Sequence, residues 1–362
     1  MSAAAAAPDA SASDRSRDWR DAALVGLAGL LLILLADALV RDQPMPRGDE
    51  LIYELISQAP FHTHTFPFAY RIGVPALVHV SPFGSTVSFS LLAWLASAAC
   101  GAVAFVLMRR FGVSRWLAAA LALCLVVCPP LLVVSLRQGR GVDPESVLVM
   151  LAGTLAIVDR RPAVLALIVL AGALVRESSL FLIPFAYAIW AQRPLDGDAA
   201  GRALAAGIPG ALAYGALRLG LPTVGRGQVL GYDSLLGGRV DVVRETLREP
   251  WSALRRLIGA FGPLWLAAPF ALRDLSFARR GLLLIALCVV AMTFAQDWGR
   301  IVLLAAPVIY VAASHVLDRR QALAIAAVVA FAAMDVGYAI YMQTSGVEHG
   351  LINGPLPAYP VR

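Results

Sequence analysis

Residues 22–40 read AALVGLAGLLLILLADALV, an apolar run that contains a single charge, Asp37. A helix rises about 1.5 Å per residue, so a run of about 20 apolar residues can cross the hydrocarbon core of a bilayer. Comparable runs recur between arginine-bearing turns as far as residue 343. The sequence therefore predicts an all-α fold, a polytopic bundle of transmembrane helices.

The composition excludes an ordinary soluble domain. Of the 362 residues, 59% are hydrophobic and 15% are charged, which is more apolar surface than a soluble core buries. The formal net charge is +6, and the sequence contains arginine but no lysine. The arginines are dispersed between the apolar runs, so we expect membrane lipids as partners and no nucleic acid. The four cysteines lie inside apolar runs, where neither a disulfide framework nor a zinc site would place them.

Apolar length and basic turns predict about eleven spans, within a range of about ten to twelve. The predicted spans are residues 22–40, 85–108, 116–136, 146–158, 162–175, 180–191, 203–219, 251–272, 282–295, 301–316 and 322–342. Residues 68–80 are too short and too interrupted by Pro75 to cross, so we expect them to be interfacial or re-entrant.

These spans form one predicted transmembrane domain, residues 22–343. Residues 1–21 are expected to be a disordered cytoplasmic N-terminus, and residues 344–362 a short extracytoplasmic tail. The first span resembles a signal peptide around Ala36-Asp37-Ala38, but its long polar leader and its length favour an uncleaved helix.

The distribution of arginine predicts the orientation. With the N-terminus inside, the turns that contain Arg109, Arg160, Arg193, Arg279 and Arg319 all face the cytoplasm, as the positive-inside rule requires. The opposite turns are then extracytoplasmic. They include two long loops, residues 41–83 and 220–250, the first with short interfacial helices. We expect a multi-pass protein of the cell inner (plasma) membrane.

The outer turns carry compact polar motifs, although arginine on that side runs against the orientation bias. The first loop contains Asp49, Glu50, His64, Tyr70 and Arg71. The other outer turns contribute Arg137, Arg140, Asp143, Arg176, Glu177, Asp297 and Arg300. Because these motifs share one face, we interpret them as one site for an anionic ligand.

Two structural alternatives stay open. Ion pairs between near neighbours, Arg176 with Glu177 or Asp297 with Arg300, would tie helix ends together without binding a ligand. His62 and His64 would ligate a metal together with the Asp49-Glu50 pair, but histidines at this spacing in an interfacial loop are more often simply polar. We therefore assign no metal ligand.

The residue types indicate the chemistry. Arginines bind a phosphate or pyrophosphate with two parallel hydrogen bonds. A nearby carboxylate serves as a general base for a hydroxyl, or holds a divalent cation such as Mg²⁺ or Mn²⁺ beside the phosphate. Nucleotide-activated donors are cytoplasmic, so a lipid-linked phosphosugar is the phosphate-bearing substrate that fits an outer site.

This layout resembles the GT-C superfamily of integral-membrane glycosyltransferases, including uncharacterised bacterial members. The similar segments are GDELIY (48–53), PFAYRIGVP (67–75), LVRESSLFLIP (174–184) and DWGRIVLLAAP (297–307). The resemblance implies a polyprenyl-phosphate-linked sugar as donor and a glycan, lipid or protein as extracytoplasmic acceptor. It also implies a catalytic acidic pair in the first outer loop, which Asp49 and Glu50 match.

Two other functions remain candidates. A transporter or flippase of a lipid-linked or anionic substrate would also use arginines and carboxylates, but normally has two related halves with broken helices near the midplane. The sequence shows no internal repeat, and its polar residues gather at one face. A non-catalytic GT-C-like membrane protein is the third candidate.

Overall fold

The computed structural model describes residues 12–39, 49–62, 64–65, 68–136, 141–224, 243–244, 247–293 and 298–345. The α-helices are α1 (Ala12–Leu39), α2 (Asp49–Gln58), α3 (Gly73–His79), α4 (Ser85–Arg110), α5 (Arg115–Val127), α6 (Pro129–Leu136), α7 (Asp143–Val158), α8 (Pro162–Val175), α9 (Leu182–Trp190), α10 (Gly197–Gly220), α13 (Pro250–Phe261), α14 (Leu264–Ala267), α15 (Ser276–Met292), α16 (Trp298–Val302), α17 (Ala306–Leu317) and α18 (Gln321–Ser345). The 3-10 helices are η1 (Phe68–Tyr70), η2 (Glu177–Phe181), η3 (Ala268–Arg273) and η4 (Leu303–Ala305).

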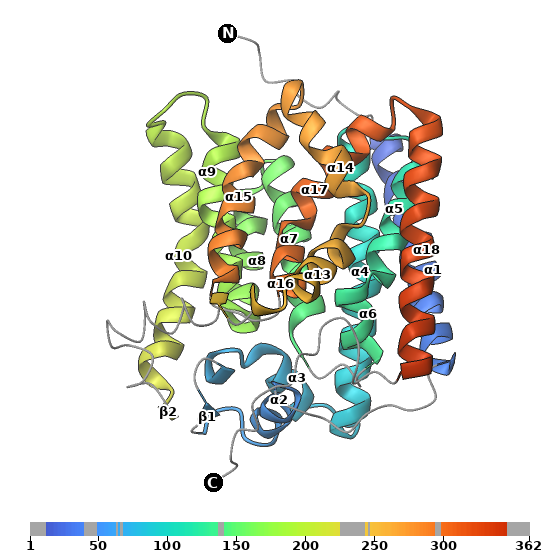
Figure 1. The fold of residues 1–362 in the computed structure, drawn as a ribbon. Helices are drawn as coiled ribbons and strands as arrows, with labels where there is room; N and C mark the ends of the chain where they lie inside the picture. Colours follow the sequence, from blue (N-terminus) through green and yellow to red (C-terminus); the bar gives the residue numbers. More distant parts are fainter. Residues whose placement is uncertain are drawn as a thin grey trace.

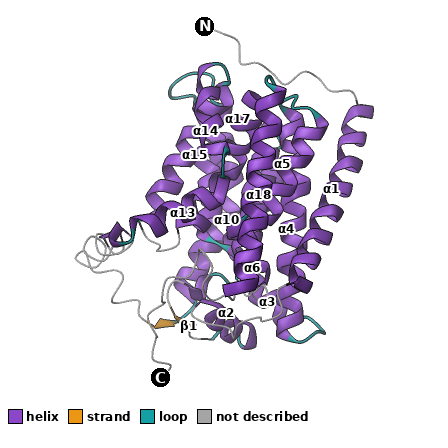
Figure 2. Cartoon of the chain, turned by 45° about the vertical axis from the view of Figure 1, so that its right-hand side comes forward, coloured by secondary structure: helices purple, strands orange, loops and turns teal. Residues whose placement is uncertain are grey.

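The prediction of a helical protein is confirmed, as the views in Figures 1 and 2 show. The strands among the described residues are β1 (His64–Thr65) and β2 (Thr223–Val224), which pair in parallel. Residues 12–21, which we expected to be disordered, belong to α1. The rest of that N-terminus, most of the 220–250 loop and the tail after residue 345 lie outside the described residues.

Several helices are long and apolar enough to cross a membrane, as a membrane protein requires. Four of the described segments qualify: α1, α4, α18 and the continuous run from α16 to α17. A fifth is added if α5 and α6, which meet at 49°, form one bent span. The other predicted spans fall in helices that are shorter or less apolar, so the total of eleven stays a prediction.

Two of the predicted spans are broken. Between α5 and α6 the chain reads Cys128-Pro129-Pro130, and proline removes a helix hydrogen bond and crowds the preceding turn. Residues 251–272 are not one helix, because α13 ends at Phe261 and the next residue, Gly262, has a φ of 47°. Glycine adopts this left-handed backbone at little cost, and the chain continues as the short helices α14 and η3.

The helices pack closely through small residues. A Cβ built at Gly210 of α10 would lie 2.7 Å from the carbonyl oxygen of Val169 in α8, and one at Gly101 of α4 would lie 2.6 Å from Val126. Close backbone approach through glycine is typical of helix pairs in membranes, where packing drives association. Leucines such as Leu31 and Leu35 remain exposed on α1, as expected of a surface that lipid covers.

The polar contacts between turns gather at the two ends of the bundle. At one end, the turns predicted to be cytoplasmic are tied together by Arg109 and Arg115 with Asp18, Arg110 with Asp159, Arg280 with the carbonyl of Ile189, and Arg319 with Asp274. The helices α2 and α3 lie at the opposite end, at the bottom of Figure 1. The predicted grouping of the turns is therefore present in the fold, and which end faces the cytoplasm remains a prediction.

Candidate functional site

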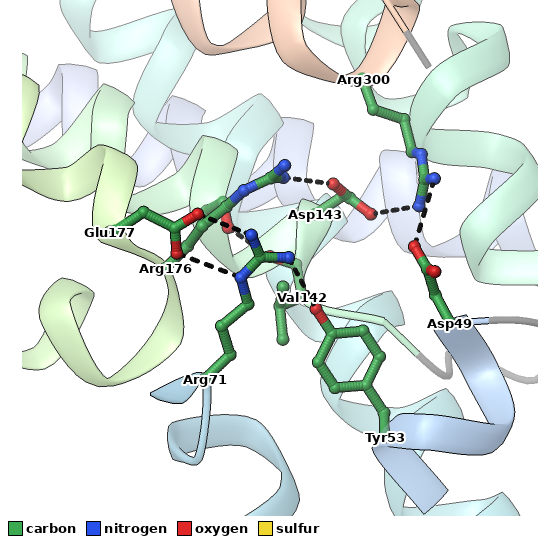
Figure 3. Close-up of polar contacts among 9 residues, drawn as sticks. Asp49, Tyr53, Arg71, Val142, Asp143, Arg176, Glu177 and Arg300 are labelled. Atoms are coloured by element: carbon green, nitrogen blue, oxygen red, sulfur yellow. Dashed lines mark hydrogen bonds and ion pairs between the residues drawn. The ribbon is translucent and has the colours of Figure 1, made fainter. Parts of the chain in front are cut away.

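The α2–α3 end of the bundle carries a network of ion pairs drawn in Figure 3. Helix α2 begins at Asp49, and Asp49 and Tyr53 are four residues apart, so they share a helix face. That face is turned toward the ends of α7, α8 and α16 (Figure 3). The short helix that follows the first span therefore presents a carboxylate and a phenol to the bundle.

Arg71 connects the first loop to the end of α8. Its Nη2 and Nε donate to the two carboxylate oxygens of Glu177 at 2.6 and 3.1 Å, and its Nη1 donates to the hydroxyl of Tyr53 at 3.2 Å. The two parallel bonds fix the guanidinium plane as well as its position. Arg71 is 9% exposed, so this pair holds the loop against the bundle from inside.

Asp143 bridges two arginines from other helices. Its Oδ1 accepts from Arg176 at 2.6 Å and its Oδ2 accepts from Arg300 at 3.0 Å. Asp143 is the first residue of α7 and Arg176 caps the C-terminal end of α8. A helix dipole favours an anion at its N-terminus and a cation at its C-terminus. The antiparallel neighbours α7 and α8 therefore bring this pair together.

Arg300 extends the network back to α2. Its Nη2 lies 3.7 Å from Oδ2 of Asp49, while its Nη1 stays on Asp143. The result is a chain of alternating charges, Arg176, Asp143, Arg300 and Asp49, across four elements (Figure 3). Together with the pair of Arg71 and Glu177, three of the arginines expected in the site contact three carboxylates.

The arginines keep these carboxylates ionised. Burial alone would raise the pKa of Glu177, but the charge of Arg71 outweighs it and lowers that pKa to about 2. Burial likewise opposes ionisation of Asp143, and the charges of Arg300 and Arg176 bring its pKa below the usual range. Glu177 is 37% exposed on its side chain, so solvent screens part of its interaction.

The observed partners differ from the neighbour pairs considered above. Arg176 pairs with Asp143, and the adjacent Glu177 pairs with Arg71. The reason is local, since Arg176 has an extended backbone, with φ −161° and ψ 140°, and consecutive side chains on an extended backbone point in opposite directions. The proposed pair of Asp297 with Arg300 lies outside the described residues, because Asp297 does.

Glu145 is a second carboxylate at the start of α7. Both of its carboxylate oxygens are buried, and neither has a hydrogen-bond partner in the part of the chain that is described. Burial raises its pKa to about 8, and the nearby charge of Asp143 acts in the same direction. Glu145 is therefore a neutral carboxylic acid near pH 7, unlike its neighbour two residues away.

The remaining predicted residues are dispersed around the network. Glu50 is 8% exposed, and adjacent residues on a helix project about 100° apart, so it does not share the face of Asp49. His64 contacts the carbonyl of Ala59 at 2.6 Å, a contact that shapes the turn after α2. Arg137 and Arg140 lie outside the described residues.

Tyr70 lies beside residues of α10 that the sequence analysis did not select. Its ring is 6.3 Å from that of Tyr214, edge to face, and the guanidinium of Arg218 sits 4.9 Å from its centre. Arg218 also donates to the hydroxyl of Tyr214 at 3.2 Å. The sequence feature that could have pointed to this cluster is an arginine four residues after a tyrosine, at the outer end of a predicted span.

A metal site is not apparent among the described residues: no group of three or more His, Cys, Asp or Glu side chains there is arranged to hold an ion. Comparison with protein-family models and with curated proteins gave no match to this chain. The site must therefore be interpreted from its own geometry.

Proposed function

We propose that this protein is a membrane glycosyltransferase that moves a sugar from a polyprenyl-phosphate donor to an extracytoplasmic acceptor, with Asp49 as general base. One observation carries the proposal: at one end of an apolar helical bundle, Asp49 lies 3.7 Å from Arg300, which Asp143 links to Arg176 at the end of α8 (Figure 3). Arginine binds phosphate, and a carboxylate beside it can take the proton of an attacking hydroxyl.

The location suits a lipid-linked ligand. A phosphate at the ion-pair network would place a polyprenyl chain among the apolar outer faces of the helices, where hydrocarbon is the natural solvent. The proposal includes about eleven spans, a GT-C-like fold, residence in the plasma membrane with the site outside, and a divalent cation such as Mg²⁺ or Mn²⁺ if the donor requires one.

The test uses purified protein in lipid nanodiscs. Undecaprenyl-phosphate sugar is offered in one arm and the matching nucleotide sugar in the other, and release of undecaprenyl phosphate or of the nucleotide is measured. We expect turnover only with the lipid donor. Asp49→Asn keeps the shape of the side chain but removes its basicity, which typically costs ~10²–10⁴-fold in rate.

The matched control is Asp274→Asn, which removes a carboxylate of an exposed ion pair at the opposite end of the bundle and should leave turnover unchanged. Turnover of Asp49→Asn within about threefold of the unmodified protein would exclude Asp49 as the base, since a positioned base contributes far more. Turnover of the nucleotide sugar alone would exclude the lipid donor.

A transporter or flippase is the second candidate, and Asp335 is the observation that favours it. This residue of α18 is 3% exposed, and its carboxylate oxygens have no hydrogen-bond partner within the described chain. Buried ionisable residues inside spans often mark ion or substrate paths. Movement of a fluorescent undecaprenyl-phosphate lipid across proteoliposomes, abolished by Asp335→Asn, would support this function over the first.

A further inference from the structure

The ion pairs of the site differ in how tightly they are closed. Arg71 holds Glu177 through two bonds, and Arg176 holds Asp143 at 2.6 Å with both side chains at most 11% exposed. The contact between Arg300 and Asp49 is the longest, at 3.7 Å, and these side chains are 26% and 34% exposed. In the pair of Arg71 and Glu177 the carboxylate is 37% exposed but the arginine only 11%, whereas both partners of the Arg300–Asp49 contact are open to solvent or a ligand.

Arg300 is shared unequally between two anions. Its Nη1 makes a hydrogen bond of 3.0 Å to Asp143, whose other oxygen is held by Arg176. Its Nη2 approaches Asp49 at a distance beyond that of a hydrogen bond. Asp143 is thus fixed between two arginines, whereas Asp49 has a looser contact at the end of the chain of charges.

We propose that a phosphate group replaces Asp49 at Arg300, and that this exchange releases Asp49 to act as a base; the inference rests on the function proposed above. A phosphate oxygen binds Nη2 of Arg300 at the 2.7–2.9 Å of a charge-assisted hydrogen bond, while Nη1 stays on Asp143. The exchange breaks no covalent bond. Arg300 is therefore a positioning residue: when it binds the phosphate, it releases the carboxylate of Asp49.

The same geometry separates the arginines by role. Arg71 and Arg176 are already bound by short contacts to carboxylates, and removing them from those partners would leave buried charges without compensation. They hold the first loop and α8 in place. Arg300 can accept a phosphate without giving up Asp143, so the phosphate binds before Asp49 becomes available to the acceptor hydroxyl.

The exchange predicts a change in the reactivity of Asp49 that does not depend on turnover. The protein in nanodiscs is treated with an excess of a water-soluble carbodiimide and an amine, and labelling of each carboxylate is measured by peptide mass spectrometry and expressed relative to that of Asp274, because phosphate also consumes carbodiimide. Undecaprenyl phosphate is added in one arm and inorganic phosphate in another. We expect either ligand, where it binds, to raise labelling of Asp49 about two- to fivefold, the range that an exposed ion pair controls.

Two variants and one internal control make the result specific. Arg300→Gln should label readily at Asp49 without ligand and should not respond to phosphate. If that variant fails to fold, Arg300→Lys keeps the charge but loses the fork that binds two anions, so its response to ligand should be smaller. Asp274, in an exposed ion pair at the other end, serves as the internal reference that corrects each arm for reagent consumed by phosphate.

The outcomes separate the exchange from the proposed function, with binding followed in parallel by tryptophan fluorescence. Undecaprenyl phosphate that binds without raising labelling of Asp49 would overturn the exchange and leave the lipid donor standing. A rise with inorganic phosphate alone would support the exchange and overturn the lipid donor. If neither ligand binds or changes labelling, both proposals fail.

Discussion

The strongest structural prediction concerns Asp143, whose carboxylate joins α7 to α8 and α16. Asp143→Asn keeps the side-chain shape but removes the charge that compensates Arg176, which has a side chain only 11% exposed. Removing one partner of a buried ion pair typically costs ~3–5 kcal/mol, because the other charge stays buried. At roughly 2–4 °C per kcal/mol for a mid-sized domain, a loss of ~3–5 kcal/mol should lower the thermal midpoint by roughly 6–20 °C.

The assay is thermal unfolding in detergent micelles, followed by circular dichroism. Asp274→Asn is the control, because its pair with Arg319 is exposed on both sides, and such pairs contribute about 0–1 kcal/mol. Combining Asp143→Asn with Arg176→Gln removes both buried charges, so the double variant should lose less stability than the two single losses added together. A loss equal to that of the control, or strict additivity, would refute the buried-pair argument.

Three further predictions follow from other parts of the structure. Burial raises the pKa of Glu145 to about 8, above the ~4.3 of an unfolded glutamate. The folded state therefore keeps a proton that the unfolded state releases, so the free energy of unfolding should fall as the pH rises from about 4.5 to about 8. Glu145→Gln should flatten this pH profile. A profile that the substitution leaves unchanged would contradict the argument. Gly299→Ala should destabilise the protein by ~1–3 kcal/mol in denaturant unfolding, because a Cβ there would lie 2.9 Å from a backbone oxygen of α13. The control is Gly201→Ala, whose Cβ would meet nothing within 4 Å, so that this change should be neutral or slightly stabilising. In a variant without native cysteines, Asp49→Cys should label with an impermeant thiol reagent from outside intact cells and Arg280→Cys should not, and the reverse pattern would overturn the orientation.

Local sequence determined the helices. Helix α8 covers residues 162–175 as predicted, and α4 begins at the predicted Ser85, because an apolar run between basic turns or prolines has few other ways to satisfy its backbone in a membrane. The grouping of turns into two ends followed from arginine position alone. The spacing of Asp49 and Tyr53, four residues apart, also places them on one face of α2 whatever their tertiary contacts are.

Only the tertiary structure decided the partners of the charged residues. Sequence neighbours suggested Arg176 with Glu177, but the extended backbone at Arg176 sends these side chains to Asp143 and Arg71. Nothing local predicts that Arg300 lies between Asp143 and Asp49, or that Arg218 packs on Tyr70. Apolar length and charge act within one helix, whereas ion pairing depends on which helix ends meet, and that is set by how the whole bundle packs.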